Sequence, residues 1–137
     1  MAGFGDDLRR FADKAERRLD YVARGTAMVG LTSIVQATPV DEGTARGSWQ
    51  LTYDAPASGD VQRLDPTGNV TISDGTNRLR AKSSVGGSAI YVVSNLPYIV
   101  RLEQGHSKQG SHMVQNFVNA FDGVVMDLAR EAERAIP

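Results

Sequence analysis

The sequence predicts an α+β fold in which long N-terminal and C-terminal helices pack on a small, mainly antiparallel β-sheet with a long loop insertion. Two observations carry this prediction. Apolar residues recur every three or four positions near both ends of the chain, which is helical spacing. Between them lie short β-branched and aromatic runs separated by turn residues, which is typical of strands. A chain of 137 residues fits a single domain over residues 1–137.

The first helix is expected over residues 6–37. The Asp6–Asp7 pair can cap its start, and Pro39 ends it because proline forces the preceding residue toward extended geometry. Each interior glycine, Gly25 or Gly30, marks a kink, a break or a close backbone approach. The face of this helix that lies opposite its apolar face is charged, and it is either a solvated surface or a contact with a neighbouring subunit. The apolar face carries Leu8, Phe11, Ala15, Leu19, Val22, Thr26 and Ile34.

The sheet is expected within residues 48–102. The segment from Ser48 to Tyr53 alternates, so that Trp49, Leu51 and Tyr53 share one side of a strand. Residues 54–68 are rich in Pro, Gly, Ser and Asp and form a long loop, a length that is usually functional or mobile. Further short strands are expected at Val70–Ile72, at Ile90–Val93 and, as a strand or a strand leading into a helical turn, at Tyr98–Leu102.

The last helix is expected over residues 111–136, with Ser111 as its cap. Methionine and phenylalanine at helical spacing are typical of core positions, so we expect this apolar face to be buried. Its members are Met113, Phe117, Ala120, Phe121, Val124, Leu128, Ala132 and Ile136.

Composition narrows the function classes. Fifteen Lys and Arg nearly cancel sixteen Asp and Glu, so no global field attracts nucleic acid or anionic lipid. The absence of cysteine excludes disulfides and thiolate metal sites. The start of the chain lacks the pattern of a signal peptide, and no apolar run approaches the roughly 20 residues that span a bilayer. We therefore expect a protein made inside the cell, with no membrane partner.

No residue pattern points to an enzyme, a cofactor or a metal. His106 and His112 lie too far apart for the adjacent-turn pairing of a helical metal site, although Glu103 could complete a ligand set with them. The glycine-bounded segment 105–110 lacks the Gly-Lys-Ser/Thr end of a phosphate loop. A small hydrolase that uses the Glu103, His106 and His112 cluster is the least favoured hypothesis.

A short basic segment is a candidate for contact with DNA or a partner. Arg78, Arg80 and Lys82 alternate, so an extended segment would present them together to phosphate. Residues 78–84 fit an extended segment or a helical turn. Acidic residues lie nearby and no series of aromatic residues accompanies the basic ones, which favours a solvated loop.

Three segments, in order, resemble the neck, or tail-completion, proteins of long-tailed bacteriophages. The first is Thr38-Pro-Val-Asp-Glu-Gly-Thr-Ala-Arg-Gly-Ser-Trp49, the second is Asp65-Pro-Thr-Gly68, and the third runs from Ser94-Asn-Leu-Pro-Tyr98 through Leu102-Glu-Gln-Gly105 to Ser107-Lys-Gln109. The resemblance covers the chain from Thr38 to about Val118. One departure stands out: Gly110-Ser111-His112 replaces the Ala-Pro and small residue usual in the family.

The resemblance implies a structural, non-enzymatic virion protein, made in the host cytoplasm. Such proteins form a homomeric ring, commonly of six copies, between the portal and adaptor or head-closure proteins and the tail terminator or tail tube. Genomic DNA passes through the ring without being read. One alternative is a tail-terminator ring that caps the tail tube. Another, of a different class, is a DNA-binding accessory protein that uses the basic segment.

If the chain forms such a ring, a few residues are candidates for chain corners within a subunit or for contacts between subunits. Trp49 is a large apolar anchor for the core or for an interface. Contacts with other neck proteins are expected from loop 54–68 and from the basic segment Arg78–Lys82. Surface ion pairs contribute roughly 0–1 kcal/mol, so charged contacts would set register more than affinity. The remaining corner and interface candidates are Tyr98, Leu102, Glu103, His106 and Lys108.

Overall fold

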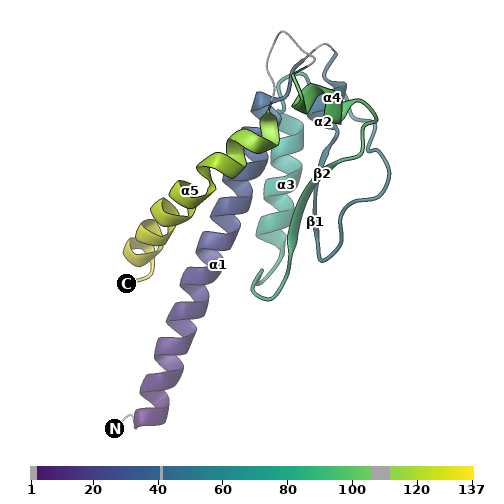
Figure 1. The fold of residues 1–137 in the computed structure, drawn as a ribbon. Coiled ribbons are helices and arrows are strands. Elements are labelled where there is room, and N and C mark those ends of the chain that lie inside the picture. The colour runs from purple at the N-terminus through teal and green to yellow at the C-terminus, as the bar shows by residue number, and fades with distance from the viewer. Residues whose placement is uncertain (1–2, 41, 106–111) are drawn as a thin grey trace.

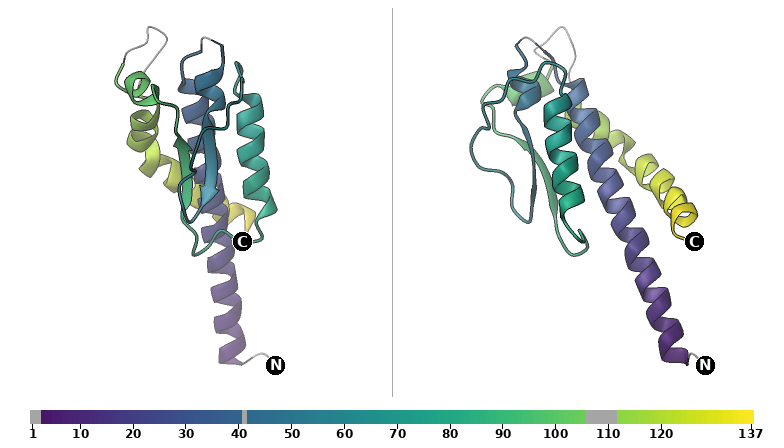
Figure 2. Two further views of the ribbon diagram at one scale, coloured as in Figure 1. Left: turned by 90° about the vertical axis from the view of Figure 1, so that its right-hand side faces the viewer. Right: turned by 180° about the vertical axis from the view of Figure 1, so that it is seen from behind.

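The computed structural model describes residues 3–40, 42–105 and 112–137. Its elements, in chain order, are α1 (Phe4–Ala37), α2 (Thr44–Gly47), β1 (Trp49–Tyr53), α3 (Asn69–Ala81), β2 (Ile90–Ser94), α4 (Ile99–Glu103) and α5 (Met113–Ala135). Long helices from the two ends of the chain and a small antiparallel sheet confirm the predicted α+β class (Figure 1). Helix α1 lies between α3 and α5, and the two strands stand beside α3 (Figure 2).

Strands β1 and β2 form a two-stranded antiparallel sheet, with Trp49 opposite Ser94 and Tyr53 opposite Ile90. Both strands lie where the sequence predicts them. The alternation of β1 buries Trp49 and Leu51 on the predicted side. Because two strands alone are marginally stable in water, the sheet depends on the helices that contact it, α1 and α3.

Helix α1 is unbroken over its 34 residues. It begins at Phe4, before the predicted start, with Gly3 as N-cap and the Asp6 carboxylate 3.4 Å from the Gly3 amide. A Cβ on Gly25 would lie 2.8 Å from Leu128, and a Cβ on Gly30 would lie 2.9 Å from the Phe117 ring. The glycines therefore permit the close approach of α5, and the alternatives of a kink or a break are wrong.

The predicted strand Val70–Ile72 is wrong, because these residues belong to helix α3. Three β-branched residues in a row favour a strand locally, but tertiary packing selects the helix. Thr71, Gly75 and Leu79 follow the helical spacing and are buried. Gly75 lies against Leu31 of α1, where a Cβ would overlap the leucine side chain. Loop 54–68, which leads into α3, contains no helix or strand, as predicted.

The segment Tyr98–Leu102 forms a helical turn and no strand. Helix α4 occupies Ile99–Glu103 with Tyr98 at its N-cap, so the strand interpretation is wrong and the helical-turn interpretation is right. The Ile99 amide donates to the Leu96 carbonyl at 3.1 Å, which closes the corner around Pro97.

Helix α5 confirms the predicted C-terminal helix, although its apolar face is only partly covered. Met113 and Ala132 are each 1% exposed, whereas Phe121 is 44% exposed. The expectation that Phe121 is a core residue is therefore wrong for the single chain. The predicted cap, Ser111, lies outside the described residues, and His112 occupies the N-cap position.

The core forms where the C-terminal half of α1 meets β1, α3 and the α4 corner. Its most buried members include Leu31, Val35, Leu51 and Leu79. The N-terminal half of α1 lies outside this core and extends beyond the rest of the molecule (Figures 1 and 2). Among the helices of the described ranges, none has the length and apolar character that crossing a bilayer requires.

Candidate functional site

The segments that carry the sequence motifs meet at the end of the molecule where α1 stops. The Trp49 indole Nε1 donates to the Thr38 hydroxyl at 2.9 Å, which joins the two ends of the first motif. The hydroxyls of Ser48 and Ser94 lie 2.6 Å apart, which joins the first motif to the third. Trp49 is 5% exposed in the single chain, so its side chain is buried without a neighbouring subunit.

Arg46 ties this region together through three backbone carbonyls. Its Nε donates to Thr38 O at 2.9 Å, its Nη2 to Gln36 O at 3.0 Å and its Nη1 to Pro66 O at 2.9 Å. The first two carbonyls lie at the end of α1, where helical backbone oxygens lack partners within the helix. The third lies in the second motif. Arg46 therefore caps α1 and fixes the first motif to the second.

Asp65 of the second motif anchors the start of α3. One carboxylate oxygen accepts from both the amide and the hydroxyl of Thr71, each at 2.7 Å. Burial alone would raise the pKa of Asp65, but the hydrogen bonds from Thr71 outweigh it and hold the pKa below its usual value. The Asp65 amide also donates to the carbonyl of Gly43, at 3.1 Å. A Cβ on Gly43 would lie 2.5 Å from the backbone of Pro66, so only glycine fits there.

Glu103 of the third motif holds the start of α5. Its carboxylate oxygens accept from the amides of Val114 and Gln115 at 2.9 and 3.1 Å, and its carbonyl accepts from His112 at 2.9 Å. A carboxylate at a helix N-terminus satisfies free amides and interacts favourably with the helix dipole. These bonds give Glu103 the predicted corner role within its own chain.

The other corner candidates divide into described and undescribed residues. Tyr98 is 43% exposed, and Leu102 is half-buried against the core. His106 and Lys108 lie outside the described residues. Within the described ranges, no group of three or more His, Asp or Glu side chains is arranged to hold a metal ion.

The basic segment is the C-terminal end of α3 and is not extended. Two residues of separation on a helix place Arg78 and Arg80 about 200° apart, so they do not form one row. Arg78 pairs with Asp74 at 3.1 Å, and the Lys82 ammonium lies 4.2 Å from the centre of the Tyr53 ring. Arg80 is exposed to solvent. The geometry does not assemble the row of phosphate contacts that an extended segment would present.

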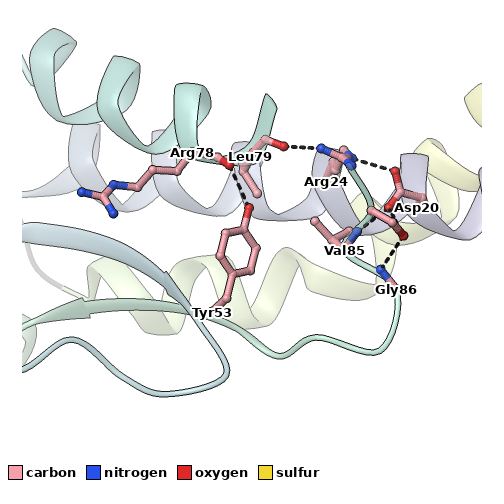
Figure 3. A network of polar contacts seen from close by, with 8 residues as sticks. Asp20, Arg24, Tyr53, Arg78, Leu79, Val85 and Gly86 are labelled. Carbon is pink, nitrogen blue, oxygen red and sulfur yellow. Dashed lines mark hydrogen bonds and ion pairs between the residues drawn. The ribbon is translucent and has the colours of Figure 1, made fainter. Parts of the chain in front are cut away.

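A second polar cluster, which the sequence analysis does not identify, fastens the middle of α1 to the far end of α3 (Figure 3). Asp20 accepts from Arg24 Nε at 2.6 Å and from the Val85 amide at 2.7 Å. Arg24 also donates to the Leu79 carbonyl, the last turn of α3. Burial would raise the pKa of Asp20, but the hydrogen bonds from Arg24 and Val85 lower it below its usual value.

Arg46, Asp65, Glu103, Asp20 and Arg24 share one chemical role, because each satisfies backbone groups at a helix end or a turn. The hydrogen bonds of these side chains fix the ends of helices and the loops between them. These hydrogen bonds hold the backbone in place, and none of them involves a reactive group.

A scan against models of protein families, a search of curated proteins and a search of solved structures each found no match to this chain.

Proposed function

We propose that this protein is a structural subunit of a bacteriophage neck. Copies of the chain form a homomeric ring, six by the resemblance, that joins the portal and adaptor or head-closure proteins to the tail terminator or tail tube. Genomic DNA passes through the ring without sequence-specific binding. The protein acts in the virion through shape and contacts, with no catalytic step and no cofactor.

The observation that carries the proposal is the convergence of the motif segments. The residues that resemble the neck family contact one another: Arg46 bonds to Pro66, Ser48 to Ser94, and Asp65 to the backbone of Gly43. Segments separated by up to about fifty residues thus form one structural unit. A resemblance carried by residues that support each other in space is stronger than one carried by isolated matches. The hydrogen-bonding role of these residues also suits an architectural protein.

A phage lacking this gene provides the test. Loss of a neck subunit is expected to leave DNA-filled heads and tails of normal length that do not join, and supplying the chain restores joined particles. Images of restored particles should show the chain as a ring between head and tail. Presence of the chain only in the cytosol, with joined particles forming in its absence, would contradict the proposal.

The same experiment separates the tail-terminator alternative, because loss of a terminator leaves tails that are abnormally long. The DNA-binding alternative predicts an affinity of the purified chain for duplex DNA that falls steeply with salt. In that case, the charge reversal Arg80→Glu would weaken binding, whereas the neck role predicts no change.

A further inference from the structure

We propose that the first part of α1 in one copy lies in an apolar groove between α1, β2 and α5 of a neighbouring copy. The inference rests on the ring proposed above and names the two surfaces that meet. The protruding segment is defined as residues 4–18. The groove has a volume of about 480 Å³ and includes Val22, Ala27, Gly30, Val92, Phe117 and Phe121 in its lining.

The protruding segment exposes large apolar side chains along one face. Phe4 is 78% exposed, Leu8 51% and Phe11 72%. Their spacing of three and four residues makes a continuous stripe along one side of the helix. Figures 1 and 2 show this part of α1 extending beyond the other elements. A contiguous apolar stripe of this kind marks an interaction surface.

The reason for the exposure is that α5 ends too early to cover the stripe. Farther along α1, α5 crosses the helix and packs on Gly25 and Gly30. The C-terminus reaches α1 near Arg18, whose Nε donates to the Ile136 carbonyl at 2.8 Å. Before Arg18, the described chain places no second element on the stripe. An element from outside the chain is needed to cover it.

The groove is suited to apolar side chains and lacks the groups that orient a small molecule. Its lining is hydrocarbon except for Thr26, whereas small-molecule sites combine an apolar wall with a few placed polar groups. The half-exposed ring of Phe121 and the side chain of Val125 extend the groove along α5. An amphipathic helix laid into such a groove, with anchors every three or four residues, is a recurring mode of recognition.

Charge complementarity favours a second copy as the occupant. The protruding segment carries five Lys or Arg and four Asp or Glu, and its excess of positive charge lies in residues 9–18, with five basic and two acidic side chains. Residues 122–133, on the part of α5 that continues from the groove, carry four Asp or Glu and one Arg. Opposite charges bordering two apolar surfaces fix the register in which those surfaces meet.

The surface area that the stripe and the groove can bury together is also adequate for a specific interface. Each phenylalanine of the stripe can bury roughly 150–250 Å², so with Leu8 and the opposing walls the contact approaches the roughly 1,200 Å² of a small specific interface. The stripe and the groove are different surfaces, so each copy donates one and receives the other. Contacts of this head-to-tail kind close into a ring where the rotation between copies closes, and otherwise they build an open filament.

The stripe cannot fill the groove of its own chain. Phe11 and Ala27 lie on the same continuous helix, 16 residues apart, which corresponds to about 24 Å along the axis at 1.5 Å per residue. A thiol crosslinker shorter than half of that distance can therefore join these two positions only between copies. The chain contains no cysteine, so two introduced thiols are the only ones present.

The test uses the full chain carrying Phe11→Cys and Ala27→Cys, as purified protein and in assembled particles. The expected result is a ladder of covalent multimers after crosslinking. The matched control carries Phe11→Cys and Leu64→Cys, because Leu64 is 66% exposed but lies outside the groove, and it should give no ladder. A second measurement compares Phe11→Ser with Leu64→Ser. Only the former should raise the concentration needed for assembly, by about tenfold or more.

The outcomes separate the two proposals. If native mass measurement shows rings but the crosslinker forms no covalent multimers, the stripe-and-groove contact is overturned and the proposal of a ring stands. Covalent dimers without larger products would show reciprocal pairing and would overturn the head-to-tail arrangement. If the unsubstituted chain forms no ring, either alone or in particles, the proposed function itself fails.

Discussion

At the scale of single residues, the chain uses charged side chains to hold backbone rather than to react. Arg46 reaches three carbonyls that belong to α1 and to the loop before α3. Asp65 fixes the first turn of α3, and Glu103 fixes the first turn of α5. Removing such a group leaves partly buried polar atoms without partners. The resulting loss of folding free energy exceeds the net stabilisation that the hydrogen bonds themselves provide.

Replacing Arg46 by lysine should lower the free energy of unfolding by about 2 kcal/mol. Lysine keeps the charge but lacks the planar fork of donors, so it cannot serve the carbonyls of Gln36, Thr38 and Pro66 together. Urea unfolding of both proteins measures the difference. Arg80→Ala is the matched control, because Arg80 is exposed, and it should stay within about 0.5 kcal/mol of the parent. Equal effects of the two substitutions would contradict the capping role.

Asp65 should contribute to acid unfolding. Its pKa is lowered in the folded state, so the stability it adds is fully present above the unfolded-state pKa of about 3.9. This contribution is lost as the pH falls through the folded-state pKa. Asp65→Asn should therefore be less stable than the parent at neutral pH by about 1–3 kcal/mol, and the gap should narrow below pH of about 4. Asp60→Asn, in the exposed loop, is the control. A constant gap at all pH values would refute the assignment.

The sequence reveals these three residues only in part. It shows that Arg46, Asp65 and Glu103 belong to motifs, but it assigns none of them a cap. Their partners are backbone groups, which no letter of the sequence distinguishes, and several lie ten or more residues away. Asp65 also sits six residues before Thr71, whereas a helix cap predicted from sequence lies two or three residues before its partner amide.

At the scale of elements, local patterns predict the two strands and the two long helices but not α3, the helix between the strands. The alternation of β1 agrees with its burial, and the spacing of α1 and α5 is sufficient to predict the two helices, although it does not show that Phe11 and Phe121 stay exposed in the single chain. Helix α3 goes against its local preference. The run Val70–Ile72 favours a strand, and Gly75 weakens a helix. Contacts with Asp65 and Leu31 decide the outcome, and both partners are remote in sequence.

Two glycine-to-alanine substitutions should change stability in opposite directions. In α3, Gly75→Ala places a Cβ on the Leu31 side chain and should cost about 1–3 kcal/mol, more than the gain in helix propensity. In α5, Gly123→Ala meets no atom within 4 Å and should stabilise the protein by up to about 1 kcal/mol. Thermal unfolding of both variants measures the contrast. A stabilising effect of Gly75→Ala would show that α3 does not pack on α1 as described.

At the scale of the whole molecule, stability and exposure are distributed unevenly along α1. Its C-terminal half is held by β1, α3 and the Arg46 cap, and its middle is held by the Asp20–Arg24 cluster. Its first turns contact none of these. A subunit made in this way is rigid where its motifs meet and presents an isolated helix to its surroundings. This division suits a chain that folds alone and completes its packing during assembly.

Hydrogen exchange should report this division directly. In the dilute chain, amides of residues 8–14 should exchange many times faster than those of residues 31–37, because a helical segment without tertiary packing opens locally at little cost. On assembly, residues 8–14 should gain protection, whereas residues 31–37 should change little because Leu31, Ile34 and Val35 already fix this part of α1 in the core. Exchange followed by mass spectrometry at low and high protein concentration measures both segments in the same sample. The exposed loop 55–60 provides a reference that should remain fast throughout if it takes no part in the contact. Equal protection of both α1 segments at the lowest concentration would mean that the protruding segment is covered within a single chain, against the exposure of Phe4 and Phe11.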